Sequence, residues 1–110
     1  MIIGTFILDF QTVNFESDSE IAKKMLSEFQ DHCQLHDAFA LDDPFSSAGW
    51  SFSKLFLTGE FVEKLYGLHG HEVDRSKGKR FADKFISWLG EGLKSKNCSA
   101  QLKVAREMIL

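Results

Sequence analysis

Phenylalanine is the residue that most constrains how this chain can fold, because it occurs 11 times in 110 positions. Each ring brings a large apolar surface, so we expect most of these rings to fill one core. Proline occurs only once, which leaves room for long helices. A chain of this length supports one core and is too short for two. We therefore expect residues 1–110 to form a single globular domain.

The composition is that of an ordinary soluble protein. Apolar residues make up 44% of the chain and charged residues 26%, and no apolar run approaches the roughly 18 residues that a membrane-spanning helix needs. The apolar N-terminus has no basic region and is interrupted by Asp9, so it is not typical of a signal peptide. Two cysteines, Cys33 and Cys98, are too few for a disulfide scaffold. We therefore expect a reduced, cytoplasmic protein with no membrane partner.

Two segments carry the alternation of a strand. Residues 2–15 are rich in β-branched and aromatic residues and have apolar side chains on both faces, which predicts one buried strand or two strands joined near Asp9-Phe10-Gln11. Residues 50–57 alternate in a similar way, but the same residues also fit the first turns of a helix.

Four segments carry the apolar spacing of helices. The S-x-x-E spacing at Ser17–Glu20 is typical of a capping box and predicts a helix from Asp18 to about His36. After the break at Asp42-Asp43-Pro44, further helices are expected to begin at Thr58, at Asp74 or Ser76, and at Asn97 or Ser99. The second of the four is expected to end near Gly67 or Gly70. The last two have apolar stripes at Phe81, Phe85, Ile86, Leu89 and Leu93, and at Leu102, Ala105, Met108 and Ile109.

These segments predict a mainly helical α+β domain. Four or five helices would pack around a phenylalanine-rich core, with a short N-terminal strand or hairpin. A strand cannot stand alone because its backbone groups need partners. The N-terminal strand is therefore expected either to form a hairpin or to pair with residues 50–57. The second arrangement would give a β-α-β-like unit or a split antiparallel pair.

No motif indicates an enzyme or a metal centre. His32 and His36 lie four positions apart on the first predicted helix, and His69 and His71 flank a glycine, but this spacing matches no known zinc module. Cys33 falls on the apolar stripe of its helix, which favours a small buried side chain over a nucleophile. No phosphate-binding loop and no Ser/His/Asp set is present. We expect a protein with no catalytic residues, no metal and no cofactor.

Charge is divided unevenly along the chain. The first 50 residues contain nine acidic and two basic residues, whereas the remaining 60 contain seven acidic and eleven basic ones. The basic excess is concentrated in residues 75–84. This asymmetry predicts a bipolar molecule, provided that the two halves do not interleave on folding.

An acidic face without a catalytic motif indicates a protein-binding module. Its most concrete form is an inhibitor or immunity protein that neutralises a basic toxin or nuclease. Asp37 and the Asp42-Asp43 pair bracket the apolar residues 38–41, which suggests an apolar centre with an acidic rim, although aspartates are also common in turns and caps. The candidate contact residues are Glu16, Asp18, Asp37, Asp42, Asp43 and Trp50.

The alternative function is nucleic-acid binding through the basic segment 75–84. Phosphates would contact its lysines and arginines. Against this stand the net charge of −3 and a pI near 5.8, since nucleic-acid-binding domains are usually basic overall.

Overall fold

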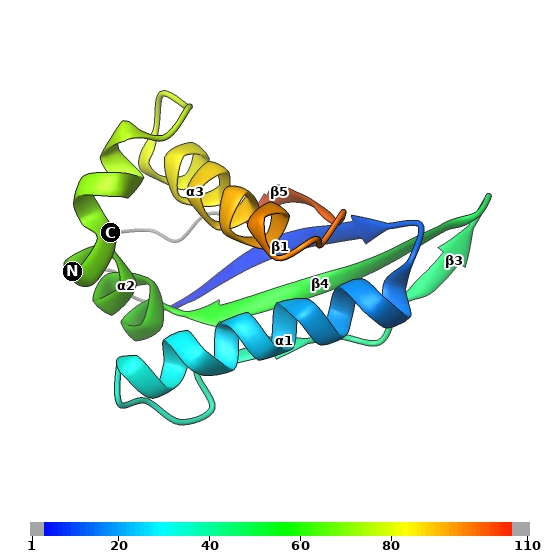
Figure 1. Ribbon diagram of the computed structural model, residues 1–110, viewed down its shortest axis with the longest axis horizontal. Helices are drawn as coiled ribbons and strands as arrows, with labels where there is room; N and C mark the ends of the chain where they lie inside the picture. The colour runs from blue at the N-terminus through cyan, green and yellow to red at the C-terminus, as the bar shows by residue number, and fades with distance from the viewer. Residues whose placement is uncertain (1–3, 107–110) are drawn as a thin grey trace.

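Residues 4–106 are the part of the chain that the computed structural model describes. They form a five-stranded antiparallel sheet with three helices on one of its faces (Figure 1). In chain order the elements are β1 (Thr5–Thr12), α1 (Phe15–His32), β2 (Phe39–Leu41), β3 (Phe45–Ser47), β4 (Trp50–Thr58), α2 (Gly59–Arg75), α3 (Phe81–Ser95) and β5 (Gln101–Arg106). In this range, none of the helices has both the length and the apolar character needed to cross a bilayer.

The centre of the sheet is the pair β1 and β4. They run antiparallel along their whole length, from Thr5 opposite Thr58 to Thr12 opposite Ser51. β5 pairs with the other side of β1, and β2 and β3 pair one after the other with the free side of β4. β1 and β2 are therefore parallel strands joined by α1, with β4 inserted between them, which is a split β-α-β arrangement. Residues 50–57 are thus a strand, and the split antiparallel pair is the correct alternative.

The core lies between the sheet and the helices. Side chains of a strand alternate between its faces, and on β1 the residues Phe6, Leu8 and Phe10 face the helices and are at most 2% exposed. Leu55 and Leu57 of β4 lie opposite them. The helices bury Met25 and Leu26 from α1, Phe61 and Leu65 from α2, and Phe85 and Leu89 from α3. Four phenylalanine rings, of Phe6, Phe10, Phe61 and Phe85, lie fully inside this core.

The predicted fold class is wrong, both in its four or five helices and in its short N-terminal strand element, because a five-stranded sheet forms one layer of the fold. Residues 4–106 contain three helices, and the segment expected to form the last helix contains strand β5 instead. Leu102 and Val104 are two apart and face the core beside Phe10 and Leu8, so the period is that of a strand. Met108 and Ile109, which completed the helical stripe, lie outside the described residues. Of the two alternatives for the N-terminal segment, the hairpin is wrong, because Thr5–Thr12 is one continuous strand that pairs with β4.

Helix boundaries agree with the sequence only in part. α1 begins at Phe15 behind Asn14, three residues before the predicted start, so Ser17 does not cap it. Thr58 does cap α2: its Oγ1 accepts a hydrogen bond from the Phe61 N–H at 3.2 Å. α2 runs past both predicted glycine ends and is kinked at His69, where φ is −124° and ψ is 16°.

Replacement of Phe85 by alanine tests the core. The ring packs 5.7 Å from that of Phe6 and 5.8 Å from that of Phe81. We expect Phe85→Ala to lower the free energy of unfolding by about 3–5 kcal/mol, because it removes a large side chain and leaves a cavity. Phe45→Ala is the matched control, since this ring is 68% exposed, and should change stability by less than about 0.5 kcal/mol. Urea denaturation of both variants would measure the difference, and equal values would contradict the assigned core.

Candidate functional site

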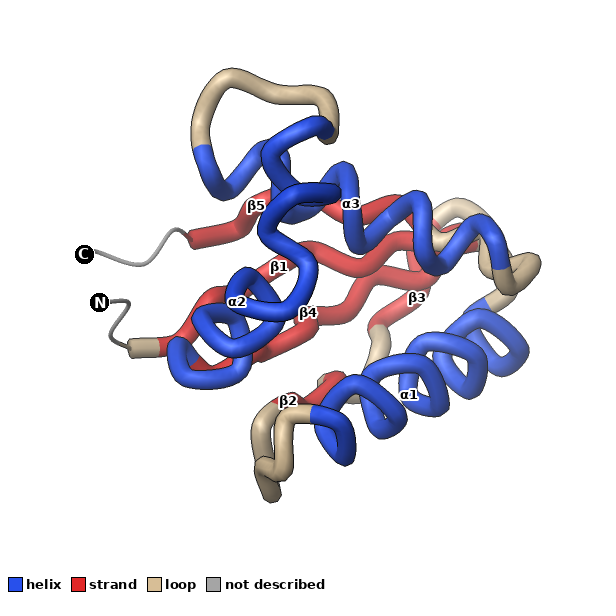
Figure 2. The backbone as a smooth tube through the Cα atoms, turned by 60° about the vertical axis from the view of Figure 1, so that its left-hand side comes forward, coloured by secondary structure: helices blue, strands red, loops and turns tan. Residues whose placement is uncertain are grey.

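In the folded chain, the acidic and the basic segments of the sequence lie at different edges of the sheet. α1, β2 and β3 lie along one edge of the sheet, and α3 and β5 lie along the other (Figure 2). Residues 13–49 hold eight acidic and two basic residues, and we call this side the acidic edge. Residues 76–106, which contain α3 and β5, hold two acidic and eight basic residues and form the basic edge. β1, from the first half of the chain, lies beside β5 of the second half, and β4, from the second half, lies beside β2 and β3 of the first. Within residues 4–106, these two strands are the only ones placed among the other half's elements, so the uneven distribution of charge along the sequence is retained in the folded chain.

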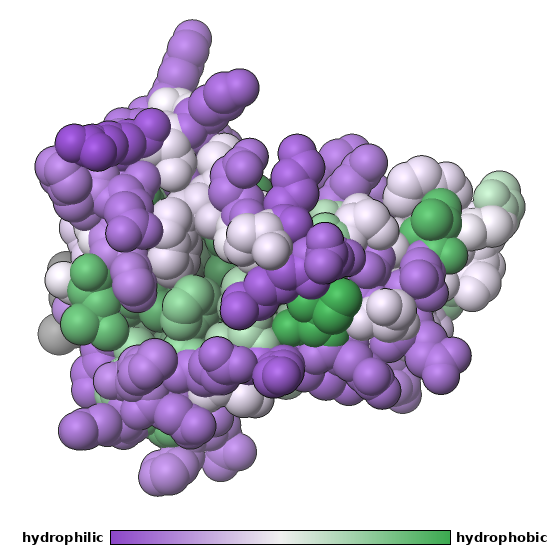
Figure 3. Space-filling view, in the orientation of Figure 1, coloured by the Kyte–Doolittle hydropathy of each residue, from purple (hydrophilic) through white to green (hydrophobic). Residues whose placement is uncertain are grey.

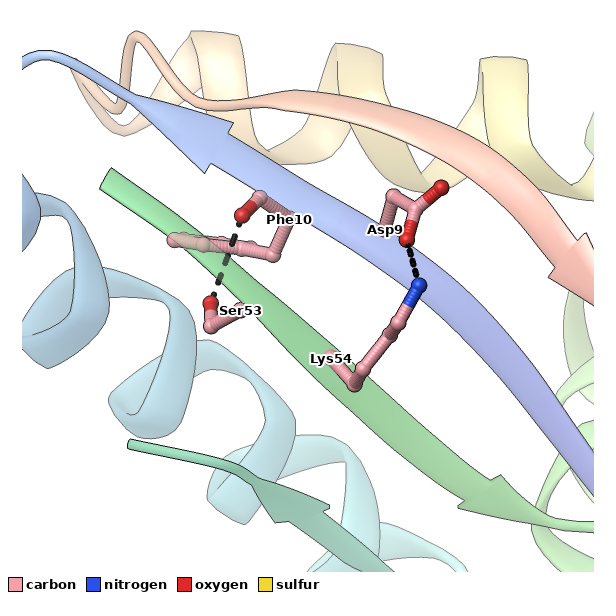
Figure 4. Close-up of polar contacts among 4 residues, drawn as sticks. All are labelled: Asp9, Phe10, Ser53 and Lys54. Atoms are coloured by element: carbon pink, nitrogen blue, oxygen red, sulfur yellow. Dashed lines mark hydrogen bonds and ion pairs between the residues drawn. The ribbon is translucent and has the colours of Figure 1, made fainter. Parts of the chain in front are cut away.

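The central strands add no net charge. β1 carries one charged residue, Asp9, and β4 carries one, Lys54. They face each other in the β1–β4 register and form an ion pair (Figure 4). On the opposite side of these strands, the Ser53 hydroxyl donates to the carbonyl oxygen of Phe10 at 3.3 Å.

We call the sheet surface that bears Asp9 and Lys54 the open face, because within residues 4–106 no helix covers it. It presents aromatic side chains. Phe45 of β3 lies opposite Phe52 of β4, and their rings stack with centroids 5.3 Å apart and planes 25° apart. The two strands are joined by a tight turn at Ala48 and Gly49, whose φ angles of 53° and 84° are those of a hairpin turn. Phe45 is an exposed ring on a β-hairpin rather than part of the core.

A cavity of about 250 Å³ lies where the open face meets the acidic edge. Its walls include the rings of Phe45 and Phe52 and the acidic residues Asp42 and Asp43, and Asp9 and Lys54 also line it. The N–H of Asp42 donates to the carbonyl oxygen of Lys54 at 2.9 Å, which fixes this loop against β4. Carboxylates beside aromatic rings suit a lysine or arginine side chain, which gains charge-assisted hydrogen bonds and a cation–π contact.

The structure gathers only some of the predicted contact residues at this cavity. Asp42 and Asp43 line it. Trp50 is half-buried at the start of β4 and, by register, lies on the same face as Phe52. Glu16 and Asp37 are exposed at the two ends of the acidic edge, in the first turn of α1 and in the loop before β2.

The apolar part of the site is not where the sequence suggested. Ala38 is buried, and Phe39 and Leu41 pack against the core, so residues 38–41 do not form an exposed centre. Phe45 and Phe52 take that place. The strand-like alternation of residues 50–57 could have placed Phe52 on one face of a strand. Phe45 could be found only from the pairing of β3 with β4.

Asp18 is not part of the exposed surface, because it is only 2% exposed. Its carboxylate accepts hydrogen bonds from the Thr12 hydroxyl, from the Ser99 N–H at 3.2 Å and from the Ser99 hydroxyl at 2.9 Å. A buried carboxylate needs such partners. Asp18 therefore ties the end of β1 to the segment before β5, and its role is structural.

Removal of this carboxylate is expected to destabilise the fold. Asp18→Ala leaves the Thr12 and Ser99 donors without their acceptor, so we expect a loss of about 2–4 kcal/mol in the free energy of unfolding. Asp31→Ala, at an exposed position of the same helix, should change stability by less than about 0.5 kcal/mol. Chemical denaturation of the two variants compares them directly, and equal stabilities would exclude the structural role.

A second surface groove lies on the basic edge. It has a volume of about 880 Å³ and is lined from the end of α2, the middle of α3 and the start of β5. Arg75, Lys77 and Lys94 line it together with Glu91. This groove contains part of the basic segment that the sequence singled out, whereas Lys79 and Arg80 lie outside its lining.

The histidines and cysteines do not form a reactive centre within the described range. No group of three or more His, Cys, Asp or Glu side chains there is arranged to hold a metal ion. Cys33 and Cys98 are both buried, and burial raises the pKa of each thiol. The neighbouring Lys64 opposes this effect at Cys33 without reversing it. A raised pKa lowers the thiolate fraction, so both cysteines behave as small apolar side chains.

Comparison with protein-family models, with curated proteins and with solved structures finds no match to this chain.

Proposed function

We propose that this protein is a non-enzymatic binding module that recognises a basic protein through its acidic edge. Its most concrete form is an inhibitor or immunity protein that covers the basic active site of a toxin or nuclease in the cytoplasm. The observation that carries the proposal is the position of Asp42 and Asp43 in one cavity with the exposed ring of Phe45 and the half-buried ring of Phe52 on which it stacks. An apolar centre with a charged rim is the usual anatomy of a protein interface.

Binding would proceed in two physical stages. The acidic edge attracts a basic partner over a distance of about a Debye length, so association is fast and weakens with salt. A lysine or arginine of the partner then enters the cavity, where its charge meets Asp42 and Asp43 and its alkyl or guanidinium part lies on the rings. The stacking of Phe45 on Phe52 limits the side-chain entropy lost on binding, because the ring is already positioned in the free protein.

A nucleic acid fits this surface poorly. Exposed rings on a sheet can stack bases, but here Asp9, Asp42 and Asp43 line the same cavity. Phosphates would be repelled by these carboxylates. The ring pair therefore supports a cationic partner.

One observation favours a second candidate function. The groove on the basic edge is lined by Arg75, Lys77 and Lys94, and a nucleic-acid backbone would find several cations along it. The acidic edge is the opposite edge of the sheet, so the two functions predict different contact residues.

The proposal predicts that charge reversal at the cavity is more damaging than the same reversal elsewhere. Tagged wild-type protein would retain a basic protein from a native lysate, and affinity for it would then be measured by calorimetry. We expect Asp42→Lys with Asp43→Lys to weaken binding about 10- to 100-fold and to reduce its salt dependence. We expect Phe45→Ala to weaken binding while leaving the salt dependence unchanged, because it removes contact area and no charge.

Glu28→Lys with Asp31→Lys is the matched control. It reverses two exposed acidic residues of α1 and changes the net charge by the same amount. Equal losses in the two double variants would show only a general charge effect and would contradict the cavity. If nucleic acid is retained instead, and Lys77→Glu with Lys94→Glu abolishes its binding, the second candidate replaces the first.

A further inference from the structure

A separate cavity of about 360 Å³ opens among the three helices, on the side of the molecule opposite the open face. Figure 3 looks onto this side and shows apolar residues gathered in the hollow between α1 and α3, framed by hydrophilic side chains. Met25 and Phe29 of α1, His69 of α2, and Trp88 and Leu89 of α3 supply its ring and apolar walls. Neither the acidic edge cavity nor the basic groove uses these five residues.

Each helix contributes one ring to a common cluster. Phe29 and Trp88 stack with centroids 5.6 Å apart, His69 lies 5.1 Å from Trp88, and Phe29 and His69 are 5.7 Å apart. The kink of α2 occurs at His69 itself, so the irregular backbone coincides with the ring that joins the other two. A kink needs a local cause, and non-helical backbone inside a helix costs free energy. In α2 this irregular residue lies in the wall of the cavity.

The rim of the cavity is mainly acidic. Glu72 accepts a hydrogen bond from the Trp88 Nε1–H at 3.2 Å, which fixes a carboxylate beside the indole. Glu91 lines the same cavity, and Lys96 is the one lysine or arginine among the described lining residues. The site thus combines aromatic walls with an excess of negative charge.

We propose that this cavity is a binding site for a small organic cation that carries an apolar ring or chain, an arylalkylamine being the simplest example. Small-molecule sites are concave, mostly apolar and provided with a few polar groups, and they commonly lie between helices. The ammonium would meet Glu72 and Glu91 and the face of a ring, and the apolar part would lie against Met25 and Leu89. The site is independent of the proposed protein-binding function, which uses the cavity where the open face meets the acidic edge.

Two glycines of α3 allow a matched test of location. Gly92 lines the cavity, and a Cβ added there would meet only the Met25 side chain, at 3.5 Å. A leucine at this position would occupy cavity space while leaving the rings and carboxylates in place. Gly90 is two residues away, lines the basic groove and has nothing within 4 Å of an added Cβ. Gly92→Leu should therefore block the ligand, and Gly90→Leu should not.

The fluorescence of Trp88, which lines the cavity, reports ligand binding in this experiment. The chain has two tryptophans, so Trp50→Phe leaves Trp88 as the single emitting indole. Its emission would be titrated with 2-phenylethylamine, 2-phenylethanol and 3-phenylpropanoate, which share a ring and differ in charge. We expect a saturable change with the amine, and binding at least about tenfold weaker for the carboxylate. Glu72→Gln with Glu91→Gln keeps an acceptor for the indole N–H and should abolish this preference.

Several results would overturn the proposal. Absence of saturation with the amine up to its solubility limit would exclude the site. Equal affinity for the three compounds would exclude recognition of a cation. Binding that survives Gly92→Leu would place the ligand elsewhere. If circular dichroism shows that Gly92→Leu does not fold, the double variant Glu72→Gln with Glu91→Gln still tests the proposal, because both positions are exposed. An unchanged preference for the amine in this variant would contradict the role of the carboxylates.

Discussion

The antiparallel pairing of β1 with β4 determines where every other element lies. Eight consecutive residue pairs join the two strands, and their side chains alternate strictly between the two faces. One face carries Phe6, Leu8 and Phe10 and must be covered, which holds the three helices on that side. The other face carries Asp9 and Lys54, which satisfy each other in the absence of a covering layer. A sheet with a single apolar core face leaves its second face available for contacts.

The same pairing keeps opposite charges apart. Because β1 comes from the first half of the chain and β4 from the second, β2 and β3 of the first half lie on one edge of the sheet and β5 of the second half lies on the other. The acidic residues of α1 and of the β2–β3 edge are thereby separated from the lysines of α3 and β5. Such a molecule has a strong dipole, which orients it during an encounter with a charged partner. The stacked rings of Phe45 and Phe52 lie at the acidic edge, where a cationic partner would arrive.

The sequence predicted the features that depend on neighbouring residues. The cap at Thr58 and the apolar stripe from Phe81 to Leu93 are local patterns, and both are present. β5 was missed because Leu102 and Ala105 also fit a helical spacing, and only pairing with β1 distinguishes the two periods. The short edge strands β2 and β3 were missed because Pro44 and the aspartates before it are typical of a loop.

The candidate site was predicted in its charges but not in its apolar part. Asp42 and Asp43 stand beside a proline and are exposed for that local reason. Asp18 also resembled an exposed cap residue, yet it is buried by contacts with Ser99, 81 positions away, that no local pattern contains. Phe45 and Phe52 become neighbours only through the hairpin register. Long-range pairing therefore supplied what local patterns could not, both in the fold and in the site.

The central claim is that recognition takes place where the open face meets the acidic edge. Amide hydrogen exchange, measured by mass spectrometry on this protein alone and in complex with a basic protein that it retains, tests that claim most directly. The account predicts slower exchange in the complex over residues 42–56 and unchanged exchange over residues 75–84. Protection confined to residues 75–84 and to the start of β5, with residues 42–56 unchanged, would contradict it.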